Sequence, residues 1–208
     1  MMDQIYYSRP RWVRWTHWVN FPILFLMIWS GILIYWANDV YHPSIPRNWY
    51  EALGWDHRLA EGMGVHFTLM WIFAVNGALY FSYLIFSGEW KHRFPWPKYW
   101  PQAWRVTLHE LGLRSEAPPA EKFNAAQRIA YTAVDLMGVM AILTGLAIYK
   151  PIQLHALTRA LGGYETARFL HYLLMVGFVA FTAIHVLQVA RAGWRCFLVM
   201  VSGWERDE

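Results

Sequence analysis

The sequence has a single cysteine, Cys196, among its 208 residues, and it is also poor in charge. One cysteine excludes a disulfide framework, a cysteine-based zinc site, a cysteine-ligated iron–sulfur cluster and a C-x-x-C-H haem attachment. Charged residues make up 15% of the chain, whereas a soluble domain has roughly 25%. Hydrophobic residues reach 57%, and there are 14 tryptophans, a residue that favours membrane–water interfaces. The composition indicates a membrane protein.

Four windows with little or no charge define the expected membrane spans. They cover about 15–38, 62–88, 129–149 and 169–190, and Asp135 is the only charged residue within them. A helix needs about 20 residues to cross the hydrocarbon core, and a backbone in lipid must satisfy its own hydrogen bonds. We therefore predict an all-α, integral membrane four-helix bundle, with residues 1–208 forming a single domain.

The distribution of basic residues predicts the orientation of these spans. Thirteen Lys and Arg lie in the N-terminal segment, the 89–128 loop and the C-terminal tail, and five lie in the other two loops. The excess predicts that both termini and the long loop of this multi-pass membrane protein lie in the cytoplasm. Because the basic residues flank apolar segments, the net charge of +4 reflects topology, and no nucleic-acid partner is expected.

The loops have patterns of their own. The 39–61 and 150–168 loops are each expected to contain a short helix, and the aromatic, proline-rich segment 94–104 is expected to lie on the membrane surface. The segment Ser30–Tyr35 is similar to Thr144–Tyr149, and in that register His17 aligns with Tyr131. This short match hints at an internal repeat without establishing one.

Four histidines lie within the apolar spans: His17, His66, His171 and His185. A histidine in a membrane is costly and usually marks a functional site. His171 and His185 are fourteen residues apart, which on one helix gives a rise of about 21 Å and an angular offset of about 40°. By depth, His17 pairs with His185 near the cytoplasmic face, and His66 pairs with His171 near the outer face. Two bis-histidine sites favour two b-type haems with iron ligated by these four residues.

Two other interpretations of the histidines remain open. A single membrane histidine often only bonds a neighbouring helix, and a metal-transport path would use the same residues, although it would favour nearby carboxylates. The remaining histidines lie in loops and are expected at the surface; they are His42, His57, His92, His109 and His155. Of these, His57 is the main rival to His66.

The chain resembles the di-haem cytochrome b subunit family of membrane-bound formate dehydrogenases, nickel–iron hydrogenases and thiosulfate reductases, and it is also similar to cytochromes of the b561 type. The resemblance covers the whole chain in span number and histidine placement. It is carried by the segments Arg14–Asn20, Val65–Phe67, Thr144–Gly145 and Glu121–Gln127, together with His171 and His185. It implies two b haems and a quinone site, for menaquinone or ubiquinone, beside the cytoplasmic haem.

The resemblance assigns the quinone site to Asn124, Ala126 and Gln127, and Ala126 stands where those relatives tend to have glycine. Asn124 and Gln127 are three residues apart and face the same way on a starting helix. Asn124 is also a good N-cap, so capping alone is the alternative. Asp135, the only charge within a span, is either a proton relay to this site or a buried, hydrogen-bonded carboxyl.

The leading hypothesis is a membrane subunit that transfers electrons between an extracytoplasmic redox partner and the quinone pool. The resemblance implies that this partner is a molybdopterin enzyme, a hydrogenase or an iron–sulfur subunit, since the chain has no motif for substrate chemistry of its own. A stand-alone quinone oxidoreductase of the cytochrome b561 type is the second hypothesis, although such proteins typically lack a long 89–128 loop. A histidine-based metal or proton transporter is the third.

Overall fold

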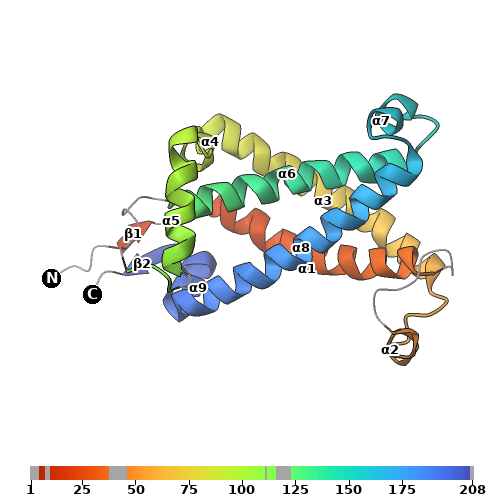
Figure 1. Ribbon diagram of the computed structural model, residues 1–208, viewed down its shortest axis with the longest axis horizontal. Helices are drawn as coiled ribbons and strands as arrows, with labels where there is room; N and C mark the ends of the chain where they lie inside the picture. The colour runs from red at the N-terminus through yellow and green to blue at the C-terminus, as the bar shows by residue number, and fades with distance from the viewer. Residues whose placement is uncertain (1–4, 8–9, 38–45, 111, 116–122, 207–208) are drawn as a thin grey trace. The chain divides into compact units, whose positions relative to one another are not determined.

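The computed structural model describes residues 5–7, 10–37, 46–110, 112–115 and 123–206 (Figure 1). Within these described residues, four helices are long and apolar enough to cross a membrane: α1 (Arg11–Tyr35), α3 (Leu59–Ser87), α6 (Ala125–Tyr149) and α8 (Tyr164–Ala192). The prediction of an all-α membrane protein with four spans is confirmed. The chain folds as two compact units, Met1–Tyr80 with Arg195–Glu208, and Phe81–Trp194.

In the first unit, α1 and the start of α3 are joined by a loop with the short helix α2 (Arg47–Ala52). The two long helices approach closely beside α2, because a Cβ atom added to Gly62 would lie 2.9 Å from the Cβ of Leu33. Further along, the amide nitrogen of Asn76 donates hydrogen bonds to the carbonyl oxygen of Thr16 at 2.9 Å and to Oδ1 of Asn20 at 2.7 Å. A small residue and a buried amide thus hold two apolar helices together.

The C-terminal segment of the first unit packs on the start of α1. Helix α9 (Trp194–Ser202) provides carbonyl oxygens to two side chains of α1: Arg14 Nη1 donates to Val201 at 2.6 Å, and Trp18 Nε1 donates to Met200 at 3.0 Å.

Strands β1 (Ile5–Tyr7) and β2 (Trp204–Arg206) then pair antiparallel, side by side in Figure 1. These two short strands were not predicted, because they pair segments nearly 200 residues apart. They place segments near both ends of the chain together, which is consistent with an even number of spans.

In the second unit, the loop before α6 folds onto the start of that helix. It contains α4 (Trp90–Arg93), the 3₁₀ helix η1 (Pro97–Tyr99) and α5 (Trp100–Glu110). Its core consists of Tyr99, Ala103, Val106 and Ala125. On the same helix as Ala103, Trp100 and Trp104 are 61% and 66% exposed, so α5 presents tryptophans on the face away from its core. The position of this segment on the membrane surface stays a prediction.

Arg128 fastens this loop to α6. The side chain is buried, its Nε donates to the carbonyl oxygen of Phe123 at 3.2 Å, and its Nη1 donates to the carbonyl oxygen of His92. Its guanidinium also lies 4.2 Å from the centre of the Tyr99 ring, close enough for a cation–π contact. Carbonyl oxygens and an aromatic face therefore surround this cation.

The two units have matching helices. Helices α1 and α6 each have 25 residues, and α3 and α8 each have 29. The short helices α2 and α7 (His155–Ala160) each have 6. Helix α3 begins in the first unit and continues into the second. The short helices expected in the 39–61 and 150–168 loops are both present, as α2 and α7. The internal repeat hinted at by Ser30–Tyr35 and Thr144–Tyr149 is thus matched by helix lengths, and each of these segments ends its helix.

The helices extend beyond the predicted spans. Helix α8 begins at Tyr164, five residues before the predicted 169, and α6 begins four residues before 129. The added turns contain Arg128, Glu165 and Arg168. A window that excludes charge ends where the hydrocarbon ends, whereas a helix continues into the polar interface where such side chains are solvated.

Candidate functional site

The imidazole of His66 is held by a hydroxyl of the neighbouring helix. Its Nδ1 lies 3.0 Å from Oγ of Ser30, and that Oγ donates its own hydrogen to the carbonyl oxygen of Leu26 at 2.6 Å. A hydroxyl has one hydrogen, so the bond between the two side chains uses the N–H of His66 Nδ1 as donor. Gly31 adjoins the same ring, because a Cβ atom there would lie 3.4 Å from Cε1 of His66.

His171 is held in the same manner in the second unit. Its Nδ1 lies 2.8 Å from Oγ1 of Thr144, which donates to the carbonyl oxygen of Met140 at 2.7 Å. The ring also forms a hydrogen bond with the backbone of Ala141. A Cβ atom on Gly145 would lie 3.3 Å from Cε1 of His171. Again the ring donates through Nδ1.

These two rings have the form of metal-ligating histidines. An imidazole that donates through Nδ1 retains an unprotonated Nε2, whose lone pair is the ligand, and an acceptor on Nδ1 fixes both the tautomer and the ring orientation. Both rings are half-buried, and both hydroxyls, Ser30 and Thr144, are fully buried. His66 and His171 therefore fit axial ligands of haem iron.

His17 lies near the start of α1, next to the polar contact formed by Asn76. The carbonyl oxygen of the preceding Thr16 accepts from Asn76 Nδ2, and the ring of His17 meets that of Trp18 edge-on at 5.2 Å between centroids. Asn76 is 2% exposed, and it was not predicted as a functional residue. The signal was an isolated amide in an apolar span, which is costly unless bonded.

His185 lies on α8 with His171. The helix is continuous from Tyr164 to Ala192, so the fourteen-residue spacing places both rings on one face of one helix. His185 is exposed, and its ring stacks on that of Phe181, with 5.9 Å between centroids and 5° between planes. The assignment of the four histidines as ligands, and their pairing, stays a prediction.

The structure brings together two of the residues expected at the quinone site. Asn124 is the N-cap of α6: its Oδ1 accepts from the backbone N–H of Gln127 at 2.8 Å, and Gln127 Oε1 accepts from the backbone N–H of Asn124 at 3.1 Å. The structure therefore confirms that Asn124 caps α6. The cap uses only the amide oxygens, so each amide still has an NH₂ group able to donate.

The other two residues assigned to that site lie on the same helix. Ala126 packs against the α5–α6 core, and Asp135 is half-buried eight residues beyond Gln127. Glu121 and Lys122, the first two residues of the segment Glu121–Gln127 that carries part of the family resemblance, lie outside the described residues.

The loop histidines have other surroundings. His57 precedes α3 and is exposed, and its Nε2 lies 3.1 Å from Oδ2 of Asp56. These surroundings favour His66 over His57 as a haem ligand. His109 Nδ1 lies 2.9 Å from the carbonyl oxygen of Arg114, and His92 is exposed. His42 lies outside the described residues.

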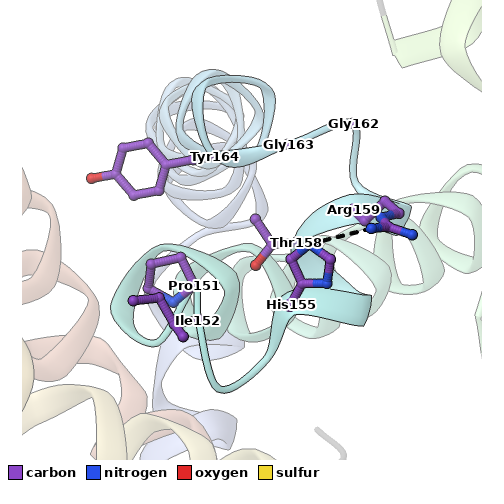
Figure 2. A pocket seen from close by; sticks show the side chains of 8 residues that line it. All are labelled: Pro151, Ile152, His155, Thr158, Arg159, Gly162, Gly163 and Tyr164. Atoms are coloured by element: carbon purple, nitrogen blue, oxygen red, sulfur yellow. Dashed lines mark hydrogen bonds between the residues drawn. The ribbon is translucent and has the colours of Figure 1, made fainter.

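A hollow of about 600 Å³ opens between α7 and the start of α8 (Figure 2). Figure 2 shows His155 and Arg159 side by side on α7, with 3.5 Å between His155 Nε2 and Arg159 Nη2. The lining residues are Pro151, Ile152, His155, Thr158, Arg159, Gly162, Gly163 and Tyr164. None was predicted as a site residue. The hollow has a largely apolar lining with His155 and Arg159 among its polar residues, and none of the span histidines lines it.

Comparison with known proteins identifies the family. A family model described as prokaryotic cytochrome b561 matches residues 8–203. The chain is also 34% identical over 207 residues to a protein of Azospira oryzae named putative protein-methionine-sulfoxide reductase subunit YedZ1, and the match covers 98% of this chain and 100% of that protein. With four membrane-spanning helices and histidines fit to bind iron, the chain belongs to the prokaryotic cytochrome b561 family, as a b-type haem protein of the bacterial cytoplasmic membrane.

Proposed function

We propose that this chain is the membrane subunit of a sulfoxide-reducing complex, in which it transfers electrons from the quinone pool to an extracytoplasmic catalytic partner. The observation that carries the proposal is the pair of histidines, His66 and His171, each held through Nδ1 by a buried hydroxyl. The name of the Azospira oryzae relative, a putative subunit of a protein-methionine-sulfoxide reductase, supports the choice of partner.

The chain would act as a single cytochrome domain with two b haems. From the depth in the membrane at which the sequence places them, His66 and His171 would ligate the outer haem. His17 and His185 would ligate the inner haem. Haem supplies one-electron oxidation and reduction, while the protein supplies binding, orientation and electrostatics. The residues of this chain contribute through the Nε2 atoms that would hold iron and through the hydroxyls that fix the rings.

The direction of electron flow follows from the proposed partner. Reduction of a sulfoxide to a thioether takes two electrons and two protons and releases one water, and oxidation of a quinol to a quinone supplies the same two electrons and two protons. Electrons would therefore leave the quinol near the inner haem, pass to the outer haem and enter the partner. The substrate chemistry would lie in the partner, because this chain has neither the cysteines nor a motif for it, and we propose that the partner is a molybdopterin-type enzyme.

The quinone site is proposed at the start of α6. A quinone carbonyl accepts hydrogen bonds, and the NH₂ groups of Asn124 and Gln127 are donors that the capping box leaves unused. Asp135, two turns further along α6, would accept a proton released from the quinol. Ala126 would lie beside the ring with its small side chain.

Asn124 permits a test that separates capping from quinone binding. Asn124→Ser keeps an N-cap oxygen but has no amide, whereas Asn124→Ala removes both. We expect both variants to lose quinol-linked haem reduction, and only Asn124→Ala to lose helix stability. Full quinol activity in Asn124→Ser, with haem retained, would refute the assignment.

The first experiment on the proposed function is a haem count. The protein is purified in mild detergent, its dithionite-reduced-minus-oxidised spectrum is recorded, and haem is measured as the pyridine haemochrome. We expect two b haems per chain, and the loss of one in His66→Ala and in His171→Ala but none in the control His155→Ala. No haem in the wild-type protein would refute the proposal, and bound zinc in its place would favour the transporter.

The partner is tested separately. We expect a larger extracytoplasmic protein to copurify with the chain and to reduce a methionine sulfoxide substrate with quinol as the electron source. Quinone reduction by the isolated chain from a small soluble donor, with no partner required, would instead show a stand-alone oxidoreductase.

A further inference from the structure

We propose that Ser30 and Thr144 are equivalent positioning residues that fix the iron-binding tautomer of His66 and His171 and thereby lower the midpoint potential of the outer haem. The inference rests on the proposed function for the presence of haem, but it assigns a role to two hydroxyls that need not touch haem or substrate. We refer to Ser30–His66 and Thr144–His171 as the hydroxyl–histidine pairs.

The positions of these residues in their helices are the first argument. Ser30 is the twentieth residue of α1 and Thr144 the twentieth of α6, while His66 is the eighth residue of α3 and His171 the eighth of α8. The helices themselves match in length. The same hydroxyl therefore meets the same imidazole at the same place in both repeats, which a chance packing contact would not require.

The hydrogen-bond geometry is the second argument. Each hydroxyl donates to the carbonyl four residues earlier in its own helix, at 2.6 Å for Ser30 and 2.7 Å for Thr144. Its hydrogen is therefore engaged, and only a lone pair faces the ring. Such a group can accept from Nδ1–H but cannot donate to a bare Nδ1, so it favours one of the two neutral tautomers of the histidine.

Burial is the third argument. Ser30 and Thr144 have no exposed surface, so no water competes for their lone pairs. The adjacent Gly31 and Gly145 bring the backbone of the hydroxyl's helix against Cε1 of each ring. Each ring is thus fixed at one nitrogen and along one edge, which defines where Nε2 lies.

The effect on haem follows from ligand basicity. A hydrogen-bond acceptor on Nδ1–H makes the imidazole a stronger base at Nε2, and a stronger base stabilises iron(III) more than iron(II). Removing the acceptor should therefore raise the midpoint potential. We expect about a tenfold change in the ratio of oxidised to reduced haem at a fixed potential, which equals about 59 mV for one electron.

The test uses full-length, haem-loaded protein in detergent and three variants of the hydroxyls. Ser30→Ala and Thr144→Val remove a hydroxyl with little change in volume, and Thr144→Ser keeps it. The matched controls are Ser87→Ala and Thr166→Val, which remove exposed hydroxyls that also bond the carbonyl four residues earlier. The measurements are the haem count, both midpoint potentials by optical redox titration, and the electron paramagnetic resonance spectrum of the oxidised haems.

We expect Ser30→Ala and Thr144→Val to raise the potential of the same haem and to alter its resonance spectrum, with Thr144→Ser and both controls like the wild type. The shift in Thr144→Val should be the smaller, because the backbone of Ala141 still accepts from His171. Loss of the outer haem in Ser30→Ala, but not in Ser87→Ala, would also support a positioning role.

Two haems with wild-type potentials and spectra in both Ser30→Ala and Thr144→Val would overturn the inference and leave the proposed function intact. No haem in the wild-type protein would overturn the proposed function and this inference with it. Shifts in two different haems would support the role of the hydroxyls but refute the pairing of His66 with His171.

Discussion

Replacing Gly62 with alanine should be costly, although alanine is normally the better helix residue. An added Cβ would lie 2.9 Å from Cβ of Leu33 and 3.0 Å from the carbonyl oxygen of Ser30. Both atoms are fixed to the backbone of α1, so no side-chain rotation relieves the overlap and the two helices must move apart. Overpacking of this kind typically costs about 1–3 kcal/mol, or roughly a 5- to 150-fold change in the folding equilibrium.

The chain provides a control of opposite sign two residues away. Gly64 lies on the same helix, and a Cβ there would meet nothing within 4 Å, so Gly64→Ala should stabilise the protein by about 0.5–1 kcal/mol. The stability of Gly177→Ala should fall between those of Gly62→Ala and Gly64→Ala, since the added Cβ would meet the flexible end of Met137 at 2.9 Å.

The assay is equilibrium unfolding in mixed micelles of increasing dodecyl sulfate content, followed by circular dichroism and by the Soret band. Gly62→Ala should also raise the potential of the outer haem, because His66 lies one turn further along α3 and its bond to Ser30 would lengthen. A Gly62→Ala protein as stable as Gly64→Ala, with unchanged potentials, would refute this account of how α1 and α3 pack.

Three further results are expected. Asn76→Leu removes two hydrogen bonds to α1 and should cost about 1–2 kcal/mol in the same unfolding assay; wild-type stability would show that the amide is dispensable. Asn124→Ala should cost about 1 kcal/mol through the lost N-cap, with Asn124→Ser close to wild type, and equal stability of the two would contradict the capping box. Burial, and secondarily the charge of Asp56, raises the pKa of Tyr50 above 10.0. The folded state then holds this proton more tightly than the unfolded state, so its contribution is complete below about pH 10 and is lost as the pH rises through the raised pKa. Wild-type protein should lose stability above about pH 10 to a greater extent than Tyr50→Phe, and parallel curves would refute the linkage.

The four membrane spans could be predicted from the sequence, because each membrane-spanning helix needs about 20 consecutive residues with little or no charge. The sequence also predicted the short helices α2 and α7 and offered the N-cap at Asn124 as an alternative, since each depends on residues near in sequence. It did not predict the start of α8, where Glu165 and Arg168 continue the helix in the polar interface. It also missed the contacts of Ser30 and Asn76, whose partners lie 36 and 60 residues away.

The two repeats are alike at one end of their helices and different at the other. Beside α2 and α7, the hydroxyl–histidine pairs occupy equivalent positions. At the opposite end, the seventh residue is His17 in α1 but Tyr131 in α6, and the twenty-second is Tyr80 in α3 but His185 in α8.

The differences at that end are consistent with different roles. Tyr131 packs edge-on against Phe123, with the guanidinium of Arg93 over its ring at 5.3 Å, so it belongs to the cluster that holds the loop on α6. The N-cap of α6 is Asn124, whereas that of α1 is Pro10, which has no side-chain cap. Under the proposed function, one end would retain two equal ligands for one haem, while the other would have diverged to provide a single quinone site from the second repeat alone.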